Sequence, residues 1–416
     1  MLNIDIHNYG RRLEKVLKQT KNSDILEENK KTISDFQRYL TVRRLSIARI
    51  ERYIQYICFV ARVIEKPFND MTKDDVVKLL EEVQKKENWC DRTKYDFKVI
   101  FRSFFKWLKQ TDEYPPEVKW IKTSKVNNHQ LPEEILTEEE VKRLIEKADN
   151  LRDKSFVSVL YESGCRIGEL LTLKIRNIQS NEYGMALNVN GKTDQRRVLI
   201  ISSAPTLASW SNTHPYRDNP NALVWIGIGT RNKNENLRYR AAVMMLKNLA
   251  ELSEIKKRVN PHSFRHARAT HLANKLTEAQ MKQYFGSKQG SDMASIYVHL
   301  SGRDTDEALL KIHGLINEED GKEKILTLKI CSRCKEKNDP VSDFCKRCGS
   351  PLELEKSLDI EEQRKDYDKT MMKLLGLITK KLTDNDPELK EEIKKEFSNW
   401  IDRNELEYLF TSDDNE

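Results

Sequence analysis

Residues 164–171 read GCRIGELL, and Arg166, the third of them, opens an ordered set of five polar residues. The other four follow in chain order: Lys192 in NGKTDQRRV (190–198), His262 and Arg265 in HSFRH (262–266), and Tyr297 in SIYVHLSG (295–302). A phosphodiester under attack gains negative charge on its non-bridging oxygens, and guanidinium groups stabilise that charge with paired hydrogen bonds. The set therefore suits attack on a DNA phosphodiester by a tyrosine hydroxyl, without a catalytic metal.

The residue types suggest separate roles. We assign Arg166 and Arg265 to a clamp on the phosphate and Tyr297 to the nucleophile. A free tyrosine has a pKa of about 10, so its hydroxyl is a weak nucleophile until a base or a positive field assists it. The arginine pair and His262 can supply that assistance.

At these residues the sequence resembles the tyrosine recombinase (phage-type integrase) family. The family pattern is Arg, Lys on a hairpin, His-x-x-Arg, His or Trp, and then Tyr. Here it runs Arg166, Lys192, His262-Ser-Phe-Arg265, Ser287 and Tyr297. The resemblance covers roughly residues 5–315, and GSDMASIYVHLSGRDTDEALLKIHG (290–314) is most similar to archaeal members.

The resemblance implies that Tyr297 forms a 3′-phosphotyrosine, so catalysis needs neither ATP nor a metal cofactor. It also implies that Lys192 protonates the leaving 5′-oxygen from a hairpin tip. Glu169 lies one helical turn after Arg166, where the family often has an acid that orients the arginine. The implied partners are double-stranded DNA and further copies of the chain, as a homodimer on one site and a homotetramer in synapsis.

Ser287 departs from the family pattern, because the family has His or Trp at this place. A serine donates one hydrogen bond but neither acts as a cation nor packs like an indole. Lys288 can substitute in a register shifted by one residue. We expect the departure to affect the rate of the reaction more than its class.

Several of these residues also have structural interpretations. Asn190-Gly191 before Lys192 is typical of a hairpin turn, where a lysine is usually only solvated, and Arg196 and Arg197 are nearby competitors for its role. His262 and Arg265, at i and i+3, can be structural residues of one helical face. Tyr297 can be a core residue of an apolar helix. The order of the whole set favours catalysis.

The predicted fold is mostly α. A helical, SAM-like core-binding domain (1–110) precedes a linker rich in proline (111–136) and an α+β catalytic domain with a small antiparallel sheet (137–315). In the first domain, Ile50, Ile54 and Ile57 repeat at helical spacing, and Thr72-x-x-Asp75 resembles a capping box. Thr137 and Glu140 form a second capping box at the start of the catalytic domain.

Four cysteines form two CxxC knuckles separated by ten residues, which resemble a zinc ribbon (328–354). The predicted ligands of one structural zinc are Cys331, Cys334, Cys345 and Cys348. A redox dithiol pair is the alternative, but such motifs rarely come doubled in so short a segment. Cys58, Cys90 and Cys165 are expected to be small buried residues.

Charge is unevenly distributed along the 416 residues, whose net charge is +7. The appendage 355–416 holds 18 acidic and 11 basic residues, so the preceding 354 residues carry +14. This asymmetry favours a nucleic-acid binder with an appendage that does not face DNA. The appendage reads as two amphipathic helices broken near residues 384–387, whose apolar faces either meet a protein partner or pack on the chain itself.

The sequence has no signal peptide and no apolar run of membrane-spanning length, so we expect a cytoplasmic, nucleoid-associated protein without a membrane partner. The leading hypothesis is a site-specific recombinase, the integrase of an archaeal mobile element. A chromosome-dimer resolvase of the same chemistry is the alternative within that class. A catalytically weak DNA-binding or regulatory protein, or an enzyme that cleaves without strand exchange, remain open.

Overall fold

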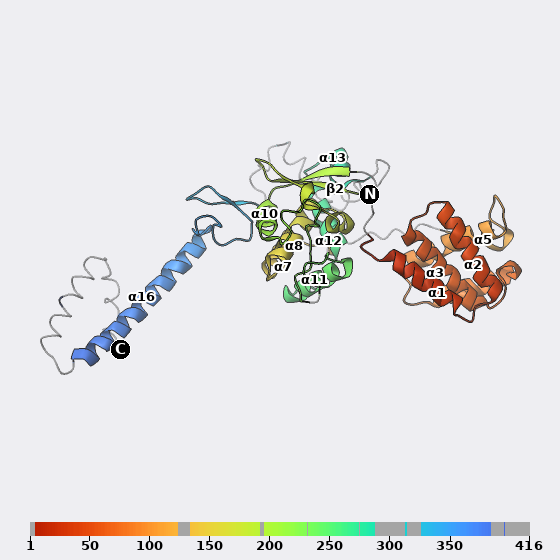
Figure 1. The fold of residues 1–416 in the computed structure, drawn as a ribbon, viewed down its shortest axis with the longest axis horizontal. Coiled ribbons are helices and arrows are strands. Elements are labelled where there is room, and N and C mark those ends of the chain that lie inside the picture. The colour runs from red at the N-terminus through yellow and green to blue at the C-terminus, as the bar shows by residue number, and fades with distance from the viewer. Residues whose placement is uncertain are drawn as a thin grey trace.

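A computed structural model of the chain describes residues 5–123, 134–191, 195–230, 232–273, 275–287, 313, 326–383 and 395. Two large hydrophobic cores organise it, one formed by buried residues between Ile25 and Ile121 and the other by buried residues between Ile135 and Ala267, beside a small cluster between Ala269 and Phe285. Figure 1 shows the two corresponding bodies, followed by a small ribbon and a long helix that projects away from them. The prediction of a mostly helical chain with a small antiparallel sheet is confirmed.

The N-terminal domain is all helical. Its helices are α1 (Tyr9–Lys21), α2 (Glu27–Val42), α3 (Ile47–Ile64), α4 (Lys73–Lys85), α5 (Asp91–Leu108) and the short α6 (Pro116–Lys119). The predicted apolar face of α3 is buried at Ile50, Ile54 and Ile57. Thr72 caps α4 through a reciprocal capping box with Asp75, as predicted.

One cysteine differs from the prediction. Cys58 and Cys165 are buried, but Cys90 is exposed. Cys90 is the residue before the first turn of α5, and its Sγ lies 3.2 Å from the Thr93 hydroxyl. The prediction was wrong because this position precedes the helix instead of lying on its apolar face.

The second domain wraps helices around a central helix, α8. Its elements are α7 (Glu138–Glu146), α8 (Leu151–Ser163), α9 (Ile167–Leu171), β1 (Ile178–Ser180), β2 (Met185–Asn190), β3 (Gln195–Ile200), α10 (Ala204–Thr213), α11 (Tyr239–Leu252), α12 (Pro261–Ala273) and α13 (Glu278–Phe285). Nearly every residue of α8 is buried, because α7, α10 and α12 pack around it. The predicted Thr137–Glu140 capping box begins α7.

The three strands form an antiparallel sheet in the order β1-β2-β3. Asn190 pairs with Gln195 at the end of the β2–β3 ladder, so the hairpin predicted around Asn190-Gly191 is present. Lys192 follows Gly191 but lies outside the described residues. The inward face of β3 carries Val198 and Ile200, both fully buried.

The remaining described chain holds the ribbon and one helix. The ribbon's strands, β4 (Lys329–Ile330) and β5 (Lys337–Asn338), pair antiparallel. Helix α16 (Leu354–Thr383) leaves Tyr367, Met371 and Leu374 exposed, and the predicted break near Asp384 lies outside the described residues. The second predicted appendage helix lies outside the described residues. Within the described part of the chain, no helix combines the length and apolar character that crossing a bilayer requires.

Candidate active site and cysteine cluster

Three arginines converge on the C-terminal end of α13. The backbone carbonyls of Tyr284, Phe285 and Gly286 each accept a hydrogen bond from a different guanidinium. Arg196 Nε donates to the Tyr284 carbonyl at 3.0 Å, and Arg265 Nη2 donates to the Phe285 carbonyl at 2.7 Å. Arg166 Nη2 donates to the Gly286 carbonyl at 3.2 Å. Because the last carbonyls of a helix carry partial negative charge, this end of α13 attracts and orders the cations.

The carboxylate of Glu169 joins two of these arginines. Arg166 lies at the N-cap of α9, and Glu169 accepts its backbone N–H at 2.9 Å and its Nη1 at 3.0 Å. Arg196 binds the same carboxylate through both terminal nitrogens, at 2.8 and 2.7 Å. Burial alone raises the pKa of Glu169, but its contacts with Arg196 and then Arg166 outweigh that effect and hold the pKa below its usual value. Glu169 is therefore a carboxylate at neutral pH.

Arg265 is buried and held from two sides. Its Nη1 donates to the carbonyl of Gly164 at 2.8 Å, and its guanidinium lies over the Phe285 ring at 5.0 Å from the centroid. Gly164 ends α8 with a φ of 54°, and a Cβ there would approach Cε1 of Phe285 to within 2.3 Å. Only glycine fits this junction between α8, α12 and α13.

His262 stands one turn before Arg265, at the exposed start of α12. Its backbone N–H donates to Oδ1 of Asn260 at 2.8 Å. Although the residue is exposed overall, desolvation of its imidazole, followed by the charges of Arg265 and Arg166, lowers its pKa. Both cationic neighbours oppose protonation of the imidazole. A neutral imidazole near the two arginines can accept a proton at pH 7.

The structure thus brings Arg166, Glu169 and Arg265 together, with His262 near both arginines. Ser287 directly follows Gly286, and its backbone N–H donates to the Lys282 carbonyl at 2.9 Å. Lys192 and Tyr297 lie outside the described residues. The catalytic roles of all seven residues remain predictions.

The contact of Arg196 with Glu169 was not predicted from the sequence, where Arg196 was considered only as a competitor for the role of Lys192. The signal lies in the alternation of β3. Arg196, Val198 and Ile200 share one face of QRRVLI, and the latter two are core residues. An arginine on a buried strand face needs a carboxylate partner, and Glu169 is that partner.

The site has an excess of positive charge, because three guanidiniums meet at the end of α13 and one carboxylate, Glu169, pairs with two of them. Arg166 keeps 33% of its side chain exposed, whereas the side chain of Arg196 is 10% exposed. Arg196 is thus mainly a support, and Arg166 is the cation open to an incoming anion. Such an arrangement suits binding of a phosphate group.

The four ribbon cysteines form a separate site. Their sulfur atoms all lie within 4.8 Å of one another, with Cys331–Cys348 at 3.6 Å and Cys334–Cys345 at 3.5 Å. Tetrahedral ligands at a Zn–S distance of about 2.3 Å would stand about 3.8 Å apart, so the cluster is close enough to hold one metal ion. The two knuckles repeat one local geometry, since Lys335 and Gly349 each follow a CxxC with positive φ, at 61° and 71°.

Comparisons with known proteins agree with this architecture. The phage integrase family model matches residues 134–303, and the N-terminal SAM-like domain of phage integrases matches residues 33–113. The tyrosine recombinase XerA of Pyrococcus horikoshii is 27% identical over 70% of this chain and 94% of its own length. A tyrosine recombinase of Thermosipho africanus is 26% identical over 68% of this chain and 99% of its own length.

Solved structures share the fold. XerH site-specific recombinase bound to a palindromic difH substrate has a TM-score of 0.53 at 16% identity, over 75% of this chain and 98% of that one. Lambda integrase bound to DNA has a TM-score of 0.52 at 14% identity, over 67% of this chain and 98% of that one. With its two matched domains and its arginine cluster, the chain belongs to the phage integrase family, the tyrosine-type site-specific recombinases.

Proposed function

We propose that this chain breaks and rejoins DNA at specific sites through a 3′-phosphotyrosine on Tyr297, as the integrase of a mobile element. Arg166 and Arg265 stabilise the phosphate during attack, Glu169 orients Arg166, His262 assists proton transfer and Lys192 protonates the leaving 5′-oxygen. The energy of the broken bond stays in the phosphotyrosine, so the rejoining step needs no ATP.

The observation that carries this proposal is the convergence of Arg166, Arg265 and Arg196 on three successive carbonyls of α13. Fixed donors that are already ordered before DNA arrives stabilise a developing charge without reorganising during the reaction. Ser287 directly follows those carbonyls, so its hydroxyl is assigned the supporting hydrogen bond that His or Trp supplies in the family pattern.

We propose a homodimer on one DNA site and a homotetramer in synapsis. Lambda integrase, which shares the fold, has been crystallised as a dimer on a COC′ core site and as a tetramer on a Holliday junction. A nucleoid-associated, cytoplasmic location follows from this DNA substrate.

A nicked duplex that traps the covalent intermediate tests the chemistry. Candidate sites are the repeats flanking the gene, and the products are separated on a denaturing gel. We expect a slowly migrating protein–DNA adduct with the natural chain and none with Tyr297→Phe, whose binding to the same DNA should be nearly unchanged. An adduct retained by Tyr297→Phe would assign the nucleophile to another residue.

A DNA-binding protein with weak catalysis is the second candidate, favoured by the serine at 287. Ser287→His separates the two, because an imidazole restored at the family position should raise the cleavage rate of a weak catalyst. If natural cleavage is already fast and Ser287→His does not raise it, the regulatory alternative is excluded. Product analysis on paired sites then distinguishes integration from resolution of chromosome dimers.

We also propose that the metal of the cysteine cluster is zinc. A closed set of four thiolates is typical of structural Zn²⁺, although iron uses the same ligands. Elemental analysis of protein purified in metal-free buffer should give one zinc per chain. Cys345→Ser should lose it, and a zinc content near zero in the natural chain would contradict the assignment.

A further inference from the structure

The ribbon lies outside both matched segments, 33–113 and 134–303, and yet it is seated on the second domain. Leu326 and Val341 pack against the core of that domain, and β5 lies beside α10. Nζ of Lys337 donates to the carbonyl of Glu182 at 2.9 Å. The ribbon is therefore a layer on the recombinase fold.

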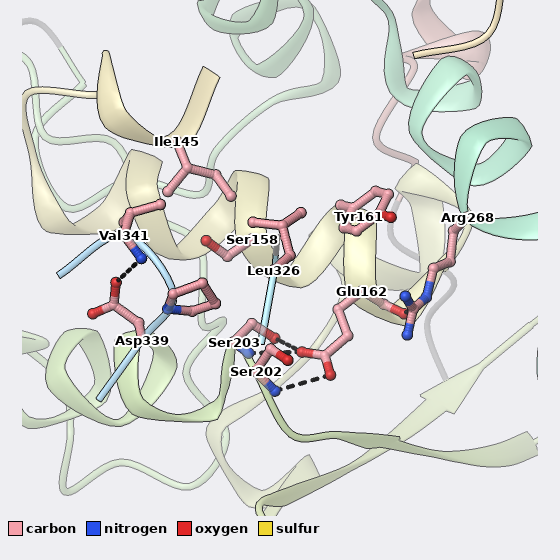
Figure 2. A pocket seen from close by; sticks show the side chains of 11 residues that line it. Ile145, Ser158, Tyr161, Glu162, Ser202, Ser203, Arg268, Leu326, Asp339 and Val341 are labelled. Atoms are coloured by element: carbon pink, nitrogen blue, oxygen red, sulfur yellow. Dashed lines mark hydrogen bonds between the residues drawn. The ribbon is translucent and has the colours of Figure 1, made fainter. Parts of the chain in front are cut away.

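Figure 2 shows the junction. Ile145, Ser158 and Glu162 line one side of a cavity of about 30 Å³, and Leu326 and Val341 line the other. That volume holds only a few water molecules, so little space is left between the ribbon and the domain there. The apolar ribbon side chains cover the surface above Glu162.

Glu162 is a structural junction of the second domain. Its carboxylate accepts the backbone N–H groups of Ile201, Ser202 and Ser203 at 2.8, 3.0 and 2.7 Å, which fixes the turn between β3 and α10. Its carbonyl accepts the hydroxyl of Tyr284 at 2.6 Å, which ties α8 to α13. The surface under the ribbon thus connects to the helix that orders the three arginines.

The ribbon cannot hold its own shape through an apolar core. Between residues 326 and 353 its buried residues are Cys331, Asn338, Pro340 and Cys345. Short internal bonds shape the covering loop: the N–H of Val341 and the hydroxyl of Ser342 donate to Asp339 at 3.2 and 2.7 Å. A module of this size with four thiolates and almost no core folds only when metal is bound.

We propose that metal binding at the four cysteines folds the ribbon into a clasp that seats Leu326 and Val341 of the same chain over Glu162. Metal loading thereby stabilises the domain that carries the arginine cluster. The proposal does not depend on DNA cleavage, since it concerns the folded chain alone. The ribbon meets the second domain through the apolar side chains of Leu326 and Val341 and through the bond from Lys337 to Glu182.

Hydrogen exchange of the full-length chain, followed by mass spectrometry, tests the proposal. We compare metal-loaded protein with protein stripped by a chelator and then freed of the chelator. Peptides from α8 and from β3 to α10 should exchange about tenfold faster without metal, since local opening becomes easier. Peptides from α2 and α3 should not change and serve as the internal reference.

Two matched variants separate seating from ribbon folding. Val341→Asp places a charge at the junction, whereas Ile330→Asp places one on β4, where the side chain is 62% exposed. Both should keep one metal per chain. Only Val341→Asp should lose protection in α8 and in the β3–α10 turn while remaining metal-loaded.

The clasp would be overturned by unchanged exchange after proven metal loss or by equal behaviour of the two metal-loaded variants. Faster exchange that spreads over α2 and α3 as well would also overturn it. Protection of α8 that rises with protein concentration would show that the ribbon of a second copy fills the junction, which overturns the assignment to the same chain.

Discussion

At the scale of single residues, the site depends on one shared carboxylate. Glu169 is 4% exposed and receives four hydrogen bonds, two from Arg166 and two from Arg196. Arg196 occupies the other face of this carboxylate and also donates to the Tyr284 carbonyl. In the proposed phosphate clamp, we expect Arg196 to position Arg166 by sharing Glu169 with it.

Replacing Arg196 by methionine should slow single-turnover DNA cleavage at least about tenfold, because Glu169 loses a partner and Arg166 is then misplaced, and misplacing a catalytic group by about 1 Å can cost more than that. Stability should fall by roughly 3 kcal/mol, since the change removes one partner of a buried ion pair. DNA affinity should change little. Single-turnover rates, binding titrations and thermal unfolding give the three quantities.

Arg197→Met is the matched control, because Arg197 is the next residue of β3 and points to the exposed face. It should leave the cleavage rate unchanged. Arg196→Lys should recover part of the rate, as one ammonium replaces a bidentate fork. Equal losses of rate in Arg196→Met and Arg197→Met would remove Arg196 from the positioning role.

At the scale of elements, α12 concentrates three histidines whose pKa values are lowered. Burial is the largest cause for His262, His266 and His271 alike. The charge of Arg265 further lowers the pKa of His262 and of His266. At His271, Glu138 raises the pKa and Arg268 lowers it, so the two charges partly offset each other. His271 is tied further by a 2.7 Å contact between its Nδ1 and the Tyr161 hydroxyl.

These lowered pKa values predict a loss of stability in mild acid. Below about pH 6.5 the unfolded chain binds protons at these histidines before the folded chain does, so unfolding becomes easier as pH falls towards the lowered values. Above pH 6.5 both states are neutral there and the effect vanishes. Thermal unfolding at pH 7.5, 6.5 and 5.5 should show a lower midpoint only at the acid end.

His271→Gln keeps a polar partner for Tyr161 but removes one titrating group, so its midpoint should fall less between pH 7.5 and 5.5. Each pH unit over which one histidine differs in protonation between the two states costs about 1.4 kcal/mol. His262, being exposed, should contribute least. A variant with the same acid sensitivity as the natural chain would mean that other groups control the transition.

The same elements show what sequence could and could not predict. Capping boxes at Thr72 and Thr137 and the hairpin after Asn190 are local, so neighbouring residues suffice to predict them. The bond from Arg265 to the Gly164 carbonyl spans 101 residues, and no local pattern encodes it.

The burial of Cys90 was predicted wrongly, because hydrophobic spacing says little about a residue just outside a helix. The seating of Val341 also escaped prediction, since it depends on a surface assembled from α7, α8 and the β3–α10 turn.

At the scale of the whole molecule, charge is divided between a basic body and an acidic appendage. Residues 1–354 carry +14, and residues 355–416 carry −7. Figure 1 shows α16 projecting away from both domains. We therefore expect its charges to act on bound DNA only over a distance. At low ionic strength such charges repel DNA, and at 0.15 M salt their reach shrinks to about 8 Å.

The appendage should therefore weaken non-specific DNA binding only when salt is low. The full-length variant Glu361→Gln, Glu362→Gln, Asp366→Asn removes three negative charges from exposed positions of α16 and changes the net charge from +7 to +10. Its dissociation constant for a duplex of unrelated sequence should be several-fold lower than that of the natural chain at 50 mM salt, and equal at 300 mM, because screening removes long-range repulsion.

The matched control, Lys365→Gln with Lys369→Gln on the same helix, should weaken binding at low salt. Tighter binding of the acid-neutralised variant that persists at 300 mM would mean that α16 contacts the DNA itself, and no change at either salt would mean that the appendage lies too far from the duplex to influence it.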